Sequence, residues 1–115
     1  MTSPPPRSGC IKRRWCSPQP IWGRPALVGA HCVVGNSVEL KNVILFDNVQ
    51  TPHYNYVGDS ILGYKSHMGA GSITSNVKSD KTLVTVKNGA ERIETGRKKF
   101  GAILGDHVEV GCNSV

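Results

Sequence analysis

Aliphatic residues followed by glycine recur along this chain about every six residues. The stretch 56–74, YVGDSILGYKSHMGAGSIT, has such pairs at 57–58, 62–63 and 68–69. A helical face needs apolar spacings of three and four, and a half-buried strand needs strict alternation, so neither regular element explains the pattern. A period of about six is typical of a parallel β-helix, in which short strands and turns coil around one axis. We expect glycine to occupy the turns, because it adopts positive φ without a Cβ penalty.

The repeat continues on both sides of this stretch and predicts the interior of an all-β coil. Upstream the six-residue spacing runs from Val28 to Phe46, and downstream it resumes at Leu104. The steps shorten to five residues around Pro52 and Val57, and we expect a site at that irregularity. The side chains predicted to face the interior are Val28, Val34, Leu40, Ile44, Leu62, Met68, Leu104 and Val110.

The repeat defines one domain at residues 26–115, and residues 1–25 differ from it in composition. The segment 1–25 holds six of the seven prolines, both tryptophans and five basic residues, with no acidic residue and no period. This composition predicts a disordered, basic, proline-rich tail. The alternative is a basic arm for nucleic acid or a membrane, but we expect neither partner. Because the sequence contains no apolar run typical of a signal peptide or a membrane span, the cytoplasm is the expected compartment.

The repeat is still in phase where the sequence stops, at VEVGCNSV in residues 108–115. A stack of coils needs a cap over its last apolar layer. We therefore expect a β-helix domain that is truncated at its C-terminus, and hence a fragment with poor solubility or ill-defined oligomers.

Between residues 77 and 100 the repeat disappears. Two alternating runs flank Asn88 and Gly89, the residues that a type I′ turn prefers, so the sequence predicts an inserted β-hairpin. Arg97, Lys98 and Lys99 follow it. Three adjacent cations are as compatible with a phosphate site as with a solvated surface.

The cysteines and histidines show no spacing typical of a metal site. Cys10 and Cys16 lie in the predicted tail, whereas Cys32 and Cys112 fall on repeat positions, so free thiols are expected. The four histidines lack the i, i+4 pairing of a helical zinc site. We expect no metal.

Two motifs relate the chain to a known family. The motif H-x-x-Y-x-G-D occupies residues 53–59, and G-A-G-[ST]-I-T-x-N occupies residues 69–76. With them, residues 26–115 resemble the left-handed β-helix acyltransferase domain of the bacterial N-acetylglucosamine-1-phosphate uridyltransferase / glucosamine-1-phosphate acetyltransferase family. They resemble even more closely the stand-alone hexapeptide-repeat proteins named UDP-N-acetylglucosamine pyrophosphorylase. The resemblance implies a left-handed parallel β-helix.

The resemblance also implies an activity and its partners. The expected function is CoA-dependent N-acyl transfer in nucleotide-sugar metabolism, with acetyl-CoA as co-substrate and an aminosugar phosphate as acceptor. A homotrimer is implied, because in this family each active site is shared between adjacent helices.

The family's catalytic histidine falls on His53, which would take a proton from the amino group of the sugar as its nitrogen attacks the acetyl thioester. A neutral imidazole is a competent base near neutral pH, and a positioned general base contributes about 10²–10⁴-fold. The other residues that the resemblance implies are Lys41 and Lys99 for the substrate phosphate, Tyr56 and Asn76 for the sugar, and Ala70 and Cys112 for the acetyl thioester and coenzyme A.

The sequence departs from the family pattern near these residues. Pro52 precedes the histidine where the family has glycine, His67 replaces a sugar-contacting asparagine, and Val77 replaces an aromatic residue. The family's upstream phosphate-binding arginine falls on Gly23. A second hypothesis therefore stands beside the enzyme: a non-catalytic solenoid for trimerisation or sugar-nucleotide binding in a nucleotidyltransferase-related protein.

Overall fold

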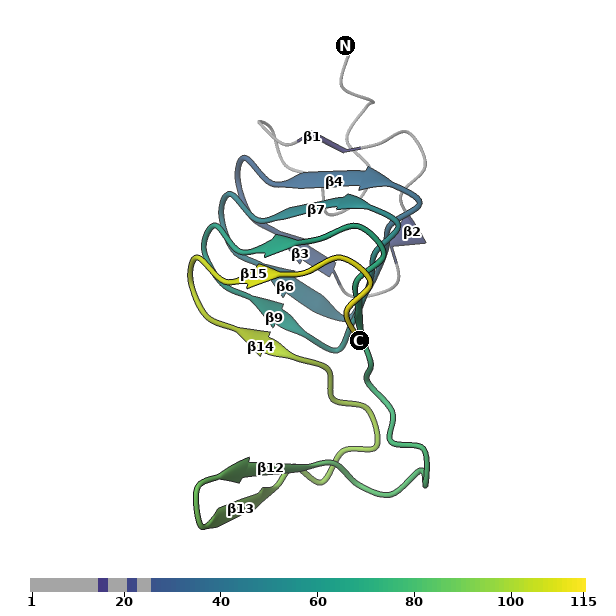
Figure 1. Ribbon diagram of the computed structural model, residues 1–115, viewed down its shortest axis with the longest axis vertical. Helices are drawn as coiled ribbons and strands as arrows, with labels where there is room; N and C mark the ends of the chain where they lie inside the picture. The colour runs from purple at the N-terminus through teal and green to yellow at the C-terminus, as the bar shows by residue number, and fades with distance from the viewer. Residues whose placement is uncertain (1–14, 17–20, 23–25) are drawn as a thin grey trace.

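The computed structural model describes residues 15–16, 21–22 and 26–115 (Figure 1). All regular elements in these residues are β-strands, so the all-β class is confirmed. Nothing in the described part of the chain forms a helix long and apolar enough to cross a membrane.

Three parallel sheets form the body of the molecule. The first contains β1 (Trp15–Cys16), β4 (Val33–Asn36), β7 (Gln50–His53), β10 (His67–Met68) and β15 (Glu109–Val110). The second contains β2 (Ile21–Trp22), β5 (Glu39–Lys41), β8 (Tyr56–Gly58) and β11 (Ile73–Thr74). The third contains β3 (Ala26–Val28), β6 (Val43–Leu45), β9 (Ile61–Leu62) and β14 (Ile103–Leu104).

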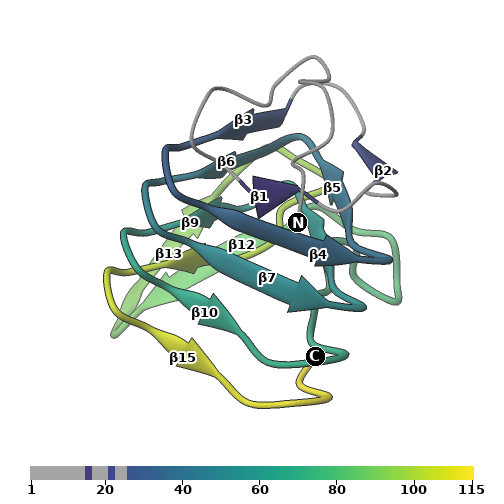
Figure 2. The ribbon, with the colours of Figure 1, turned by 90° about the horizontal axis from the view of Figure 1, so that it is seen from above.

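From β3 onward the chain visits the third, first and second sheets in turn and then begins the next coil beside the one before it (Figures 1 and 2). This is the stacked parallel arrangement that the six-residue repeat predicts. Two of the strand pairings, β1 with β4 and β2 with β5, involve residues of the segment 1–25. The remaining residues of that segment lie outside the described residues, so the tail stays a prediction.

From β3 to β11, residues paired between neighbouring coils are seventeen positions apart, as Ala26 with Val43 and Leu45 with Leu62 show. The coil that carries the insertion is longer, since Ile61 pairs with Ile103. A seventeen-residue coil contains two six-residue sides and one five-residue side, and the short step lies at the corner between the second and third sheets, where the insertion also leaves the coil after β11. The five-residue steps of the sequence are thus a regular part of the fold. The expectation that they mark an irregularity is wrong.

The corners are built by left-handed residues, of which few are glycine. Positive φ occurs at the coil corners at His31, Ser37, Asn42, Asn48, Tyr54, Asp59, Lys65, Gly71, His107 and Asn113. Asn and Asp enter this region more easily than other side chains do. The prediction that the repeat glycines supply the positive φ is therefore wrong.

Those glycines instead allow the coils to stack closely. A Cβ on Gly35 would collide with the carbonyl of Pro52 in the next coil. A Cβ on Gly63 would lie 2.6 Å from the carbonyl carbon of Gly105. Glycine is therefore required at these repeat positions because the backbone of the next coil leaves no room for a Cβ atom.

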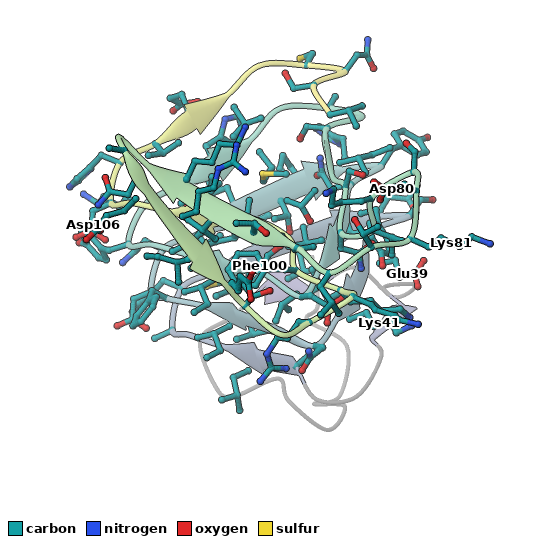
Figure 3. All side chains as sticks on the ribbon, turned by 90° about the horizontal axis from the view of Figure 1, so that it is seen from below. Glu39, Lys41, Asp80, Lys81, Phe100 and Asp106 are labelled. Carbon is teal, nitrogen blue, oxygen red and sulfur yellow. The ribbon has the colours of Figure 1, made fainter. Side chains whose placement is uncertain are left out.

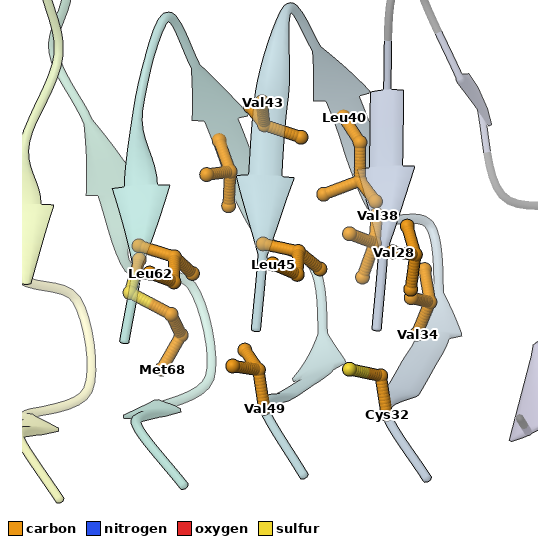
Figure 4. Close-up of a cluster of buried hydrophobic side chains, with 11 residues drawn as sticks. Val28, Cys32, Val34, Val38, Leu40, Val43, Leu45, Val49, Leu62 and Met68 are labelled. Carbon is orange, nitrogen blue, oxygen red and sulfur yellow. The ribbon is translucent and has the colours of Figure 1, made fainter. Parts of the chain in front are cut away.

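The interior is a narrow column of aliphatic side chains from all three sheets (Figure 4). Five of the predicted interior residues are buried: Val28, Val34, Leu40, Leu62 and Met68. Leu104 and Val110 are partly buried and pack against this cluster. Ile44 was predicted inside but is 38% exposed, because the five-residue step after Leu40 brings Leu45 inward instead.

The insertion, residues 77–100, leaves the coil after β11 and returns before β14. It contains the antiparallel hairpin of β12 (Thr85–Asn88) and β13 (Glu91–Glu94), which projects beyond the last coil in Figure 1. Asn88 pairs with Glu91, so the turn residues are Gly89 and Ala90. Only Gly89 has positive φ, which is the pattern of a type II′ turn. The hairpin is present, but the predicted type I′ turn is wrong by one position.

Candidate functional site

His53 lies at the end of β7, at the corner where the first sheet gives way to the second, and its side chain is exposed. Its backbone is held on both sides: the N–H donates to Asn55 Oδ1 at 3.2 Å, and the carbonyl accepts from the Gly71 N–H at 3.1 Å. The imidazole has no hydrogen-bond partner among the described residues. The backbone of His53 is therefore held in place by hydrogen bonds, whereas none from the described residues fixes the orientation of its imidazole ring.

Asn55 connects this histidine to the next coil, and sequence reasoning missed it. The Asn55 side chain is buried, and Nδ2 donates to Gly69 O at 2.8 Å and to Ser72 Oγ at 3.0 Å. A buried amide with its donors and acceptor satisfied is a rigid support. Its sequence signal is a polar residue at a repeat position that faces the interior.

Ala70 lies one coil after His53 at the same corner. Its carbonyl accepts from the Asn113 N–H at 2.9 Å, which places Cys112 at this corner on the following coil. The Ala70 N–H has no acceptor within the described part of the chain. Cys112 is an exposed free thiol. The structure thus brings His53, Ala70 and Cys112 together along one edge of the coil. Ala70 lies on the coil between those of His53 and Cys112, and its backbone N–H is the donor without an acceptor.

A second polar cluster occupies the corner between the second and third sheets. Asn76 Nδ2 donates to the Tyr56 hydroxyl at 3.1 Å and to Asp59 Oδ2 at 2.7 Å. The other carboxylate oxygen of Asp59, Oδ1, accepts from Asn42 Nδ2 at 2.7 Å. Tyr56 and Asn76, predicted to contact a sugar, are therefore direct neighbours.

Lys41 reaches the same corner from β5, where its carbonyl accepts from the Asp59 N–H at 2.9 Å. Its side chain is half-buried. Figure 3 shows Lys41 and Glu39 on one flank of the coil, away from Asp106.

Lys99 lies on the other side of this corner. A cavity of about 280 Å³ on the outer face of the third sheet is lined by Arg97 and Lys99, by Asn42 and Asp59, and by aliphatic side chains of the sheet. Lys98 does not line it. Lys41, Tyr56 and Asn76 are not part of its wall. The predicted substrate residues therefore form two groups. Lys41, Tyr56 and Asn76 lie on one side of Asp59, and Lys99 lies in the cavity on the other.

Arg97 was considered only as one of three adjacent cations, and the structure distinguishes it. Arg97 and Lys99 both line the cavity, whereas Lys98 between them does not. A guanidinium and an ammonium beside an apolar wall form an anion-binding environment.

Asp80, near the start of the insertion, accepts from the Thr82 N–H at 3.0 Å and from Thr82 Oγ1 at 2.7 Å. The backbone hydrogen bond from Thr82, followed by that from its hydroxyl, lowers the pKa of Asp80 below its ordinary value. Within the described residues no three His, Cys, Asp or Glu side chains gather as metal ligands.

No protein-family model matches the chain. The bifunctional sugar-1-phosphate nucleotidylyltransferase/acetyltransferase of Sulfurisphaera tokodaii is 39% identical over 80 residues, which are 70% of this chain and 20% of that protein. The bifunctional protein GlmU of Methanococcus aeolicus is 44% identical over 78 residues, 68% of this chain and 19% of its own length. The GlmU of Trichodesmium erythraeum is 39% identical over 94 residues, 76% of this chain and 19% of its own.

The identity extends over most of the coil, and the chain spans about a fifth of the length of these relatives. The family that the two motifs indicated is thereby confirmed. This chain belongs to the family of the bifunctional sugar-1-phosphate nucleotidylyltransferase/acetyltransferases and GlmU proteins.

Proposed function

We propose that this chain carries the acetyl-transfer part of such a protein, and that it transfers the acetyl group of acetyl-CoA to the amino group of an aminosugar phosphate. The observation that carries the proposal is the edge formed by His53, Ala70 and Cys112. It sets a solvent-accessible imidazole one coil away from a backbone N–H that no other described group uses.

In the proposed reaction, His53 acts as the general base. The amino nitrogen attacks the thioester carbonyl, the imidazole removes the proton from that nitrogen, and the carbon–sulfur bond breaks to release coenzyme A. Charge develops on the carbonyl oxygen during the attack. A backbone N–H with no acceptor among the described residues, such as that of Ala70, would donate to this oxyanion and stabilise it.

The acceptor sugar phosphate would be held at the neighbouring corner. Tyr56 and Asn76 form a hydrogen-bonded pair suited to ring hydroxyls, and Lys41 and Lys99 supply positive charge for the phosphate. Cys112, an exposed residue of the following coil, would line the groove for coenzyme A beside Ala70.

The alternative is a non-catalytic solenoid that binds sugar nucleotides or trimerises. The unpartnered imidazole of His53 favours it, since no described residue sets the tautomer of the ring. Catalytic hydrogen bonds are often incomplete before substrate binds, however. Release of coenzyme A thiol from acetyl-CoA, measured with and without glucosamine 1-phosphate, separates the two. Release that depends on the sugar supports the enzyme, and its absence supports the solenoid.

Three further properties belong to the same proposal. We infer a left-handed coil, from the family resemblance, and a crystal structure would test the handedness. We infer a homotrimer, which sedimentation of the chain would test against a monomer. The proposed compartment is the cytoplasm, where acetyl-CoA is available.

A further inference from the structure

Asp59 has no role in the reaction described above, although it ends the motif that begins with His53. Every polar group of this residue is engaged. Its N–H donates to Lys41 O at 2.9 Å, and its carbonyl accepts from the Gly101 N–H at 2.8 Å. Its two carboxylate oxygens accept from Asn42 and Asn76, each at 2.7 Å.

Asn42, Asp59 and Asn76 form a polar column along one edge of the coil. Each is seventeen residues from the next, which is one coil, so the fold stacks them directly. The carboxylate in the middle receives an amide hydrogen from each neighbour. Charge-assisted hydrogen bonds of this kind are stronger than those between neutral groups.

The residues of this column make hydrogen bonds at both ends of the insertion. Asn76 immediately precedes the insertion, and its side chain is held by Asp59 and Tyr56. The carbonyl of Asn76 accepts from the Phe100 N–H at 2.9 Å, and Val77 bridges to Lys99 beside it. Asp59 also binds Gly101, the first residue after the insertion, through its carbonyl.

We propose that Asp59 is a positioning residue that fastens both ends of the insertion to the coil and thereby sets Lys99 and Arg97 relative to Tyr56 and Asn76. The carboxylate of Asp59 holds the Asn76 side chain, and its backbone carbonyl holds Gly101, so one residue binds the chain on both sides of the insertion. The substrate part of this inference rests on the proposed function, whereas the structural part does not.

Asp59→Asn is the informative variant. Asp59 has φ 49, and Asn adopts this left-handed region as readily as Asp, so the backbone is preserved. The new amide has the shape of the carboxylate but carries no negative charge, so its hydrogen bonds to Asn42 and Asn76 are no longer charge-assisted. The column is therefore weakened. Asp47→Asn is the matched control: Asp47 also lies at a corner and accepts the Ala30 N–H at 2.7 Å, but it does not contact the insertion.

Hydrogen exchange of backbone amides measures the fastening directly. In Asp59→Asn the amide of Phe100 should exchange about tenfold faster, because the hydrogen bonds that hold Asn76 lose their charge assistance and the local opening becomes easier. The amide of Gly69, bound to Val110 O inside the coil, should keep the parental rate. Asp47→Asn should change neither. A parental rate at Phe100 in Asp59→Asn, or the same acceleration in Asp47→Asn, would overturn the proposal.

Kinetics supply the second measurement. Asp59→Asn should raise the KM for glucosamine 1-phosphate about tenfold while the KM for acetyl-CoA stays unchanged, since only the sugar side is misplaced. Simple loss of folded protein would lower kcat and leave both KM values unchanged, and that result would contradict positioning. If the parent chain acetylates no aminosugar phosphate, the proposed function fails, and the exchange rates still decide the role of Asp59.

Should Asp59→Asn not fold, Asn76→Ala removes the same hydrogen bond from its donor side and must accelerate exchange at the Phe100 amide.

Discussion

Replacing Leu45 by alanine should destabilise the coil far more than replacing its neighbour, Phe46. Leu45 is 2% exposed and lies between its register partners, Val28 of β3 and Leu62 of β9. Removing an enclosed leucine side chain costs its transfer free energy plus that of the cavity, together about 3–4 kcal/mol. Phe46 is 52% exposed, so truncating its ring should cost only about 1 kcal/mol.

Urea unfolding followed by far-ultraviolet circular dichroism measures this difference. The unfolding midpoint of Leu45→Ala should fall well below that of Phe46→Ala, with the dependence of the free energy on urea unchanged in both. In a thermal scan, Leu45→Ala should lower the melting temperature by roughly 12–30 °C. A strict six-residue spacing continued from Leu40 would place Phe46 inside and Leu45 outside. Equal costs, or a larger cost for Phe46, would therefore refute the seventeen-residue coil.

Three other predictions concern the site and the insertion. His53→Ala should lower acetyl transfer about 10²–10⁴-fold with unchanged circular dichroism, and parental turnover would remove His53 from the mechanism. Lys99→Ala should raise the KM for the sugar phosphate more than Lys98→Ala does, because only Lys99 lines the cavity; equal effects would indicate diffuse attraction. Since Thr82 lowers the pKa of Asp80, their contact is complete above the ordinary carboxyl pKa and is lost as the pH falls through the lowered value. The amide signal of Thr82 should titrate accordingly in NMR spectra, and a midpoint at the ordinary value would contradict it.

Much of the fold could be predicted from the sequence because one side chain in six must face a narrow interior. Val28, Val34 and Leu40 were placed correctly on that ground. The prediction failed after Leu40, where the next interior residue follows after five positions. Nothing in the apolar pattern distinguishes Leu45 from Phe46, because both are large and hydrophobic. The difference is set by Asn42, a polar residue that turns the corner one position earlier.

The glycines were recognised for the wrong physical reason. Sequence patterns show where glycine is required but do not show whether φ or crowding requires it. At Gly35 and Gly69 the requirement is crowding, since a Cβ would strike the backbone of the next coil. Contact between coils involves residues far apart in the sequence, and a local turn argument does not detect it.

The candidate site was only partly accessible from the sequence. His53 and Ala70 were found through motifs, and the structure adds that they lie on one edge of the coil. Asn55 and Asp59 were missed, although both stand inside the motif H-x-x-Y-x-G-D that begins at His53. Their side chains bind neighbouring coils instead of any expected ligand, so a search for catalytic residue types passes over them.

The seventeen-residue coil explains why the motif spacings carry structural information at all. Residues one coil apart are stacked at about the separation of adjacent strands in a sheet. Asp59 therefore meets Asn42 and Asn76 because each is seventeen residues away, and Ala30 meets Asp47 for the same reason. A polar residue repeated at this interval marks an edge where side chains bind one another along the stack. On this argument the Asn42, Asp59 and Asn76 column was present in the sequence, and only the length of the coil was needed to find it.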